Sequence, residues 1–134
     1  GLDLGEKTIG VAVSDTTRMI ASPLSLVRKT KFTEDAHAVL KLMDGRKASG
    51  LVMGLPLNMD GTPSDMSARA EKFARRLNGR FNLPVHTHDE RLTTFEAKGE
   101  RLRQGQHGSY RDRPVDALAA ALLLEGWLSD HPAA

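Results

Sequence analysis

The chain has 134 residues, a mass of 14.6 kDa, 40% hydrophobic and 27% charged side chains, and a formal net charge of +2. This composition is ordinary for a globular protein, and the length predicts one domain covering residues 1–134. Cysteine is absent, which excludes disulfides, thiolate metal sites and a cysteine nucleophile. No apolar run approaches the roughly 18–20 residues of a membrane span, and the first residues lack a signal-peptide pattern, so we expect a cytoplasmic protein without membrane contact.

The first half of the chain predicts the antiparallel part of a sheet followed by a helix. Residue patterns indicate three strands, at 2–4, 9–14 and 20–27. The short turn between the first two strands makes them a hairpin, and Pro23 suggests that the third lies at an edge or carries a bulge. Apolar residues at helical spacing predict a helix over residues 33–43, which Gly45 ends.

The second half alternates strands with helices. It predicts strands at 51–55 and 85–89 and helices at 62–79, 93–105 and 114–128. Leu51–Leu55 is apolar on both faces, which indicates a buried central strand parallel to its neighbour. Thr62 is the expected N-cap of the next helix and Gly79 its expected end. This order predicts an α/β fold of three layers, with a mixed sheet of five strands and helices on both faces.

Asp3 stands out because it interrupts an apolar strand. It points to the face of the sheet opposite Leu2 and Leu4, alongside Gly1 and Gly5. That face carries almost no side-chain bulk, so a ligand could approach the backbone closely. Taken alone, Asp3 is more simply explained as an aspartate at the end of a strand that caps a turn.

Two further carboxylates occupy comparable places. Asp116 lies in the first turn of the final helix, on the same face as Ala120 and Leu123, where an ionised carboxylate is costly unless it is paired or bound to metal. A role as an N-terminal cap remains open for it. Glu90 follows the strand 85–89, where a charged turn is the simpler interpretation.

Together these carboxylates predict a metal site. Asp3, Glu90 and Asp116 can converge at one edge of the sheet, where they would repel one another unless a cation lies between them. Oxygen ligands suit Mg²⁺ or Mn²⁺, and such a site performs metal-assisted hydrolysis of a phosphodiester. A competing interpretation is a zinc site at His86, His88 and Glu90, although histidines on a strand are commonly just polar surface.

The net charge hides an asymmetry along the chain. Residues 69–113 carry 11 basic and 6 acidic side chains, a net charge of +5, whereas residues 114–134 carry 3 acidic side chains and none that is basic. The basic excess is rich in arginine, whose planar fork donates paired hydrogen bonds to phosphate. Nucleic-acid binding and a set of solvated helix faces are both compatible with this pattern.

Four segments carry a resemblance to a known family. They are GLDLGEKTIGVA at residues 1–12, GLPLNMDG at 54–61, DERLTT at 89–94 and VDA at 115–117. Each segment alone is a weak signal, but all four in this order are specific. Over nearly all of its length the chain resembles the YqgF/RuvX family of RNase H-like proteins, described as Holliday-junction resolvases or pre-16S rRNA nucleases.

The resemblance implies an RNase H-like fold and a metal-dependent nuclease. It implies that Asp3, Glu90 and Asp116 are the catalytic triad and hold Mg²⁺ or Mn²⁺. It also implies a substrate of structured RNA, the precursor of 16S rRNA, with the ribosome as a possible partner. The expected contacts to the nucleic acid are Lys7, Asn58, Arg91, Thr93, Arg111 and Arg113.

Three alternatives stay open at this stage. The same site could act as a resolvase on branched DNA, since both substrates are read through phosphates and shape. The chain could instead be a nucleic-acid-binding module that does not cleave. Phosphotransfer from ATP is a weaker alternative, because the turn after Asp3 resembles the first phosphate loop of actin-like ATPases but one domain offers no second half to clamp a nucleotide.

Overall fold

Five strands form one mixed sheet in the computed structural model, which describes residues 1–46, 48–89 and 115–131. The strands are β1 (Leu2–Leu4), β2 (Thr8–Ser14), β3 (Ala21–Arg28), β4 (Leu51–Leu55) and β5 (Val85–Asp89). Their order is β3-β2-β1-β4-β5. Strands β1, β2 and β3 pair antiparallel, whereas β4 runs parallel to both β1 and β5. The predicted strands, the hairpin and the mixed sheet are therefore confirmed.

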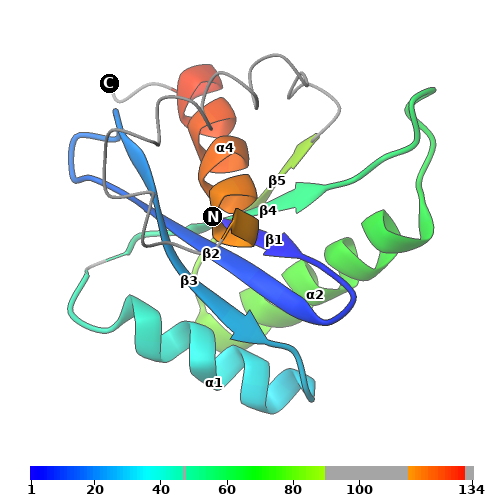
Figure 1. Cartoon of the computed structure of the whole chain (residues 1–134). Coiled ribbons are helices and arrows are strands. Elements are labelled where there is room, and N and C mark those ends of the chain that lie inside the picture. The colour runs from blue at the N-terminus through cyan, green and yellow to red at the C-terminus, as the bar shows by residue number, and fades with distance from the viewer. Residues whose placement is uncertain (47, 90–114, 132–134) are drawn as a thin grey trace.

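Helices cover both faces of this sheet, as Figure 1 shows. The described helices are α1 (Phe32–Met43), α2 (Asp65–Phe81) and α4 (Val115–Asp130). Helices α1 and α2 lie on one side, which we call the α1–α2 face, and α4 lies on the other, the α4 face. The predicted three layers are confirmed, while the helix expected over residues 93–105 lies outside the described residues.

Large side chains fill the α1–α2 face. Leu2 and Leu4 of β1 point into this core, where Ile9 and Met53 come from the neighbouring strands. Helix α2 adds Phe73 and Leu77, among others. Strand β1 shows the burial pattern of a strand with one apolar side, because Asp3 between the two leucines is only half-buried.

The α4 face is packed with smaller side chains. Ala12 and Ala21 of the antiparallel strands meet Ala120 and Ala121 of the helix. Helix α4 therefore lies close to the strands, and a Cβ atom built on Gly1 would come within 2.8 Å of Leu124 Cβ. Close packing of this kind fixes the helix against the face of β1 that carries Asp3.

The ends of α2 differ from the sequence prediction. Its N-cap is Ser64, not Thr62, because the Ser64 hydroxyl accepts a hydrogen bond from the Ser67 amide and the Ser67 hydroxyl accepts one from the Ser64 amide. The helix also continues through Gly79 and ends at Phe81. Asn82 follows in the left-handed conformation, with φ of 54°, and supplies the stop that Gly79 was expected to give.

Strand β3 lies at one edge of the described sheet, as Pro23 predicted. The pairing of β2 with β3 shifts register between Val11 and Ala12, so the expected irregularity is also present. In the part of the chain that the structure describes, none of the helices is long and apolar enough to cross a membrane.

Candidate active site

Asp3 lies in the central strand of the sheet, between β2 and β4. Its neighbours Leu2 and Leu4 are buried in the core of the α1–α2 face, so the Asp3 side chain belongs to the α4 face, as the alternation predicted. A central strand is held by hydrogen bonds on both sides, which makes it a rigid mount for a catalytic group.

Glycines surround Asp3 on the α4 face. Gly10 is its partner across β1 and β2, and the pairing of Leu2 with Met53 places Gly54 of β4 level with Asp3 on the other side. Both glycines lie roughly 5 Å from Asp3, the spacing of adjacent strands. Gly1 and Gly5 flank it along its own strand. We call these four residues the glycine floor.

The glycine floor extends what the sequence showed. The alternation along one strand reveals Gly1 and Gly5, but Gly10 and Gly54 join the floor only through the register between strands. A signal was present, since each of these two glycines interrupts a strand of otherwise larger residues. An isolated glycine in a strand often marks a close approach by a ligand or another backbone.

Helix α4 brings Asp116 to the same face of the sheet. Asp116 falls in the first turn of this helix, one turn before Ala120. Gly1 anchors that part of the helix, because a Cβ atom on Gly1 would lie 3.0 Å from the Ala120 carbonyl oxygen. The backbone thus places Asp3 and Asp116 on elements that pack directly against each other.

Glu90 directly follows β5, whose last residue is Asp89. Strand β5 ends level with Leu55, the last residue of β4, so both parallel strands finish at the same edge of the sheet. In open α/β sheets the carboxyl ends of parallel strands are where ligands bind. Glu90, like Arg91, Thr93, Arg111 and Arg113, lies outside the described residues, and their predicted roles stay predictions.

The surroundings of Asp3 fit a hydrated divalent cation. A carboxylate oxygen is a ligand that Mg²⁺ and Mn²⁺ prefer, and the four glycines put no side chains of their own beside it, although α4 covers Gly1. Among residues 1–46, 48–89 and 115–131 there is no group of three or more His, Cys, Asp or Glu side chains that could hold a metal ion. Two of the three predicted ligands, Glu90 and Asp116, have side chains outside that description.

The histidines of β5 contact α4 instead of forming a described metal cluster. The centroid of the His86 ring lies 5.0 Å from that of Trp127, and Trp127 also stacks on His131, with 4.3 Å between their centroids. His88 is buried against Gly126, where an added Cβ atom would lie 2.8 Å from its Nε2 atom. Both rings thus pack the β5 edge against the helix.

Lys7 and Asn58 are the two predicted nucleic-acid contacts whose surroundings the structure describes. Lys7 is exposed in the turn between β1 and β2, and its carbonyl oxygen accepts a hydrogen bond of 2.9 Å from the Lys29 amide. The side-chain amide of Asn58 donates to Thr62 Oγ1 at 3.0 Å and to the Pro63 carbonyl at 3.2 Å. Asn58 therefore braces the loop after β4 from within.

The chain is similar to a known family and to known proteins along almost its whole length. The family model RuvX, described as Holliday junction resolvase, matches residues 1–130. A Pseudomonas putida protein named "Putative pre-16S rRNA nuclease" is 66% identical over 129 residues, which are 96% of this chain and 92% of that protein. A protein of Azotobacter vinelandii with the same name is 60% identical over 133 residues, 99% of this chain and 94% of its own.

A solved structure shows the same fold. The RuvC structure from Thermus thermophilus superposes with a TM-score of 0.60 at 15% sequence identity and covers 97% of this chain and 93% of its own. At that identity the similarity establishes the fold alone, which is RNase H-like, as expected. From the match over residues 1–130 and the close relatives, the chain belongs to the RuvX family.

Proposed function

We propose that this chain is a metal-dependent nuclease that hydrolyses phosphodiester bonds of structured RNA, in the maturation of the 5′ end of 16S rRNA. The observation that carries the proposal is Asp3, a carboxylate on the central strand with glycines on both neighbouring strands. Membership of a nuclease family and the names of the close relatives support the same reaction and the rRNA substrate. The reaction takes place in the cytoplasm, with the ribosome or its precursor as the partner.

Asp3, Glu90 and Asp116 are the proposed catalytic residues. They would hold Mg²⁺ or Mn²⁺, which supplies a Lewis acid for the phosphate and lowers the pKa of a bound water. Asp3 fixes the position of the site because it lies on the most firmly held strand, and α4 carries Asp116 to it. The glycines add no side chains of their own beside Asp3, while Gly1 is the point at which α4 packs on the strand.

Cationic and polar side chains around this edge would orient the substrate. Lys7, exposed in the β1–β2 turn, can neutralise a phosphate next to the one that reacts. Arg91, Arg111 and Arg113 are proposed phosphate contacts, since guanidinium groups bind phosphate in a bidentate manner. Thr93 and Asn58 complete the proposed set, Asn58 by holding the shape of the β4–α2 loop.

A four-way DNA junction is the second candidate substrate, favoured by the description of the family model. Phosphate contacts and shape would serve both nucleic acids. Symmetric cleavage of a junction needs two active sites and therefore two copies of the chain. Paired symmetric cuts are thus the outcome that separates this candidate from the rRNA nuclease.

The decisive experiment compares the unaltered chain with Asp3→Asn. Both are incubated with Mg²⁺, Mn²⁺ or a chelator and with two labelled substrates, a pre-16S rRNA fragment and a four-way DNA junction. We expect cleavage of the RNA that requires the metal and falls at least about a hundredfold in Asp3→Asn, because loss of a metal ligand weakens binding and activity by more than an outer contact does.

Full activity in Asp3→Asn, with the metal still required, would contradict the assigned site. Cleavage of the junction alone would replace the RNA by branched DNA as the substrate. Absence of cleavage on both substrates, with binding retained, would favour a binding module. A thermal melt of Asp3→Asn shows that the variant is folded, which we expect because Asp3 contributes little to either apolar core.

A further inference from the structure

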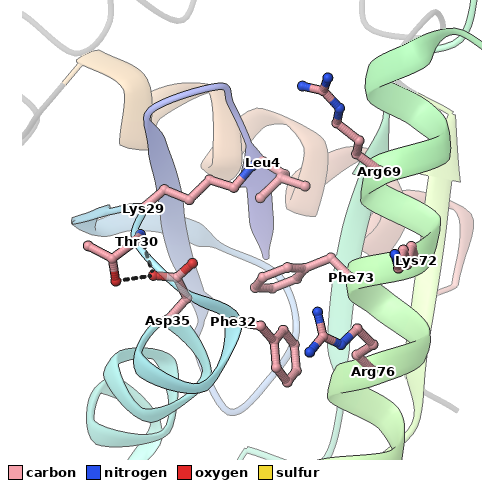
Figure 2. Close-up of a pocket in the computed structure, with 9 residues that line it drawn as sticks. All are labelled: Leu4, Lys29, Thr30, Phe32, Asp35, Arg69, Lys72, Phe73 and Arg76. Atoms are coloured by element: carbon pink, nitrogen blue, oxygen red, sulfur yellow. Dashed lines mark hydrogen bonds between the residues drawn. The ribbon is translucent and has the colours of Figure 1, made fainter.

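A hollow of about 200 Å³ opens on the α1–α2 face, between the start of α1 and the side of α2. Its wall and floor are formed mainly by Lys29, Phe32, Arg69, Lys72, Phe73 and Arg76. Figure 2 shows Arg76 beside the Phe32 ring, Lys29 reaching in from the opposite side, and Arg69 farther along α2. We call this site the basic hollow. Its volume corresponds to several water molecules at roughly 30 Å³ each, which is ample space for a phosphate group.

The basic hollow carries a strong excess of positive charge. Four of its lining residues are Lys or Arg, and Asp35 is the one acidic residue among those that line it, so its formal charge is +3. Lys29 comes from the segment after β3, whereas the other three cations lie on α2. An ordinary solvated helix face would account for the α2 residues alone, but not for a fourth cation that faces them from another element.

Asp35 does not neutralise this charge. Its side chain is only 2% exposed, and its Oδ1 atom accepts hydrogen bonds from the Thr30 amide at 2.9 Å and the Thr30 hydroxyl at 3.2 Å. Within the part of the chain that the structure describes, no carboxylate forms an ion pair with the four cations. Arg69, Lys72 and Arg76 are exposed and Lys29 is partly buried, so solvent and salt screen their mutual repulsion, and an anion that enters the hollow is attracted by all four.

Aromatic rings fix one of the cations in place. Phe32 and Phe73 meet edge to face with their centroids 5.3 Å apart. The Arg76 guanidinium lies 3.8 Å from the centroid of Phe32. Stacking on a ring holds the guanidinium plane but leaves its N–H edges able to donate, which is the arrangement that suits a phosphate oxygen.

The basic hollow lies on the opposite face of the sheet from Asp3, but one of its lining residues is the sequence neighbour of Asp3. Leu4 lines the hollow, and Leu4 is the residue that follows Asp3 in β1. The exposed Lys7 turn connects the two places, because the Lys29 amide donates to the Lys7 carbonyl. A nucleic-acid strand that leaves the Asp3 site over this turn thus passes from one set of cations to another.

We propose that the basic hollow binds a backbone phosphate of the substrate, several nucleotides from the bond that is cut. This inference rests on the proposed function, since it assumes that the substrate is a nucleic acid. It assigns Lys29, Arg69, Lys72 and Arg76 a role in holding the substrate on the face of the sheet that carries no catalytic residue. The contact adds affinity and register but no base specificity.

The test removes two cations from opposite walls, in Lys29→Gln with Arg69→Gln. This pair avoids Arg76, whose ring contact supports the fold. The matched control is Lys31→Gln with Arg75→Gln, which removes one lysine and one arginine that are exposed but do not line the hollow. All proteins carry Asp3→Asn so that the labelled pre-16S rRNA fragment and DNA junction stay intact during titration.

We expect the hollow variant to bind about ten- to a hundredfold more weakly, the range that corresponds to one or two charged hydrogen bonds. The slope of log Kd against log salt should fall by about 1, because the hollow holds one phosphate, and the control should change affinity less than about threefold. The substrate that shows the loss identifies the backbone that the hollow holds. An equal loss in both variants, or no loss on either substrate, would overturn the proposal.

A second measurement separates this proposal from the proposed function. With Asp3 restored, the hollow variant should show a raised KM and an unchanged kcat on the rRNA fragment, because the lost contact is remote from the reacting bond. A lowered kcat at saturating substrate would contradict a purely anchoring role. Failure of the unaltered chain to cleave any substrate would count against the proposed nuclease function. The binding comparison would still show whether the basic hollow holds the nucleic acid.

Discussion

The two faces of the same sheet are built in opposite ways. On the α1–α2 face, large side chains such as Leu2, Ile9 and Met53 fill a thick core. On the α4 face, alanines pack the helix close to the strands, and four glycines surround Asp3. One face therefore supplies apolar burial, and the other places a half-buried carboxylate among residues without side chains. The difference shows that the surroundings of a candidate catalytic carboxylate can depend on which side chains are missing.

The largest effect on stability should come from the core of the α1–α2 face. Leu77 of α2 is fully buried, so Leu77→Ala should lower the free energy of unfolding by about 2–5 kcal/mol through lost burial and the cavity left behind. Urea denaturation measures the change. Leu40→Ala is the control, because Leu40 is 49% exposed and should cost less than about 1 kcal/mol. Equal effects of the two substitutions would mean that this core is not the main source of stability.

An intermediate effect should follow from closing the gap between α4 and β5. Gly126→Ala places a methyl group 2.8 Å from His88 Nε2, and His88 is buried. Overpacking of this kind costs about 1–3 kcal/mol, against about 1 kcal/mol gained in helix propensity, so the net change should be destabilising. Thermal denaturation checks the sign.

His88→Ala offers a direct control for that prediction. In the His88→Ala background the clash is gone, and Gly126→Ala should become neutral or stabilising. The coupling between the two substitutions in a double-mutant cycle should therefore be of the order of the overpacking penalty. Additive effects would show that His88 does not set the distance between α4 and β5.

The smallest effect should come from a glycine in the helix on the other face. Apart from the adjacent residues and the backbone of its own helix, no atom lies within 4 Å of a Cβ built on Gly79, which is inside α2. Gly79→Ala should thus stabilise the protein by about 0.5–1 kcal/mol, because alanine is the better helix former and no neighbour has to move. Replacing glycine by alanine should therefore stabilise the protein in α2 and destabilise it in α4. A destabilising Gly79→Ala would contradict this difference between the two helices.

Much of the fold could be predicted because its signals are local. The apolar run Leu51–Leu55, the hairpin and the alternation around Asp3 each depend on a few adjacent residues, and the structure confirms them. The predicted end of α2 was wrong because that prediction, too, used only a local signal. Gly79 carries a common stop signal, but Leu77 and Phe81 on either side of it pack into the core and keep the backbone helical up to Asn82.

The site could be predicted only in part. The position of Asp3 on the α4 face follows from its two leucine neighbours, but Gly10 and Gly54 enter the picture only once the strand register is known. The basic hollow is harder still, since Lys29 and Arg69 are forty residues apart and meet only when β3 and α2 are packed on the same face. A pattern of a few adjacent residues cannot reveal a contact between residues so far apart in the sequence.

The edge strand β3 has a consequence for how copies of this protein can meet. An unprotected edge is a template for another strand, and sheets that extend in this way polymerise. Pro23 sits inside β3 and has no N–H to donate, and proline within an edge strand is one of the features that disfavour the addition of another strand. Two copies of this chain are therefore less prone to pair along β3 than two copies with an uninterrupted strand at that edge would be.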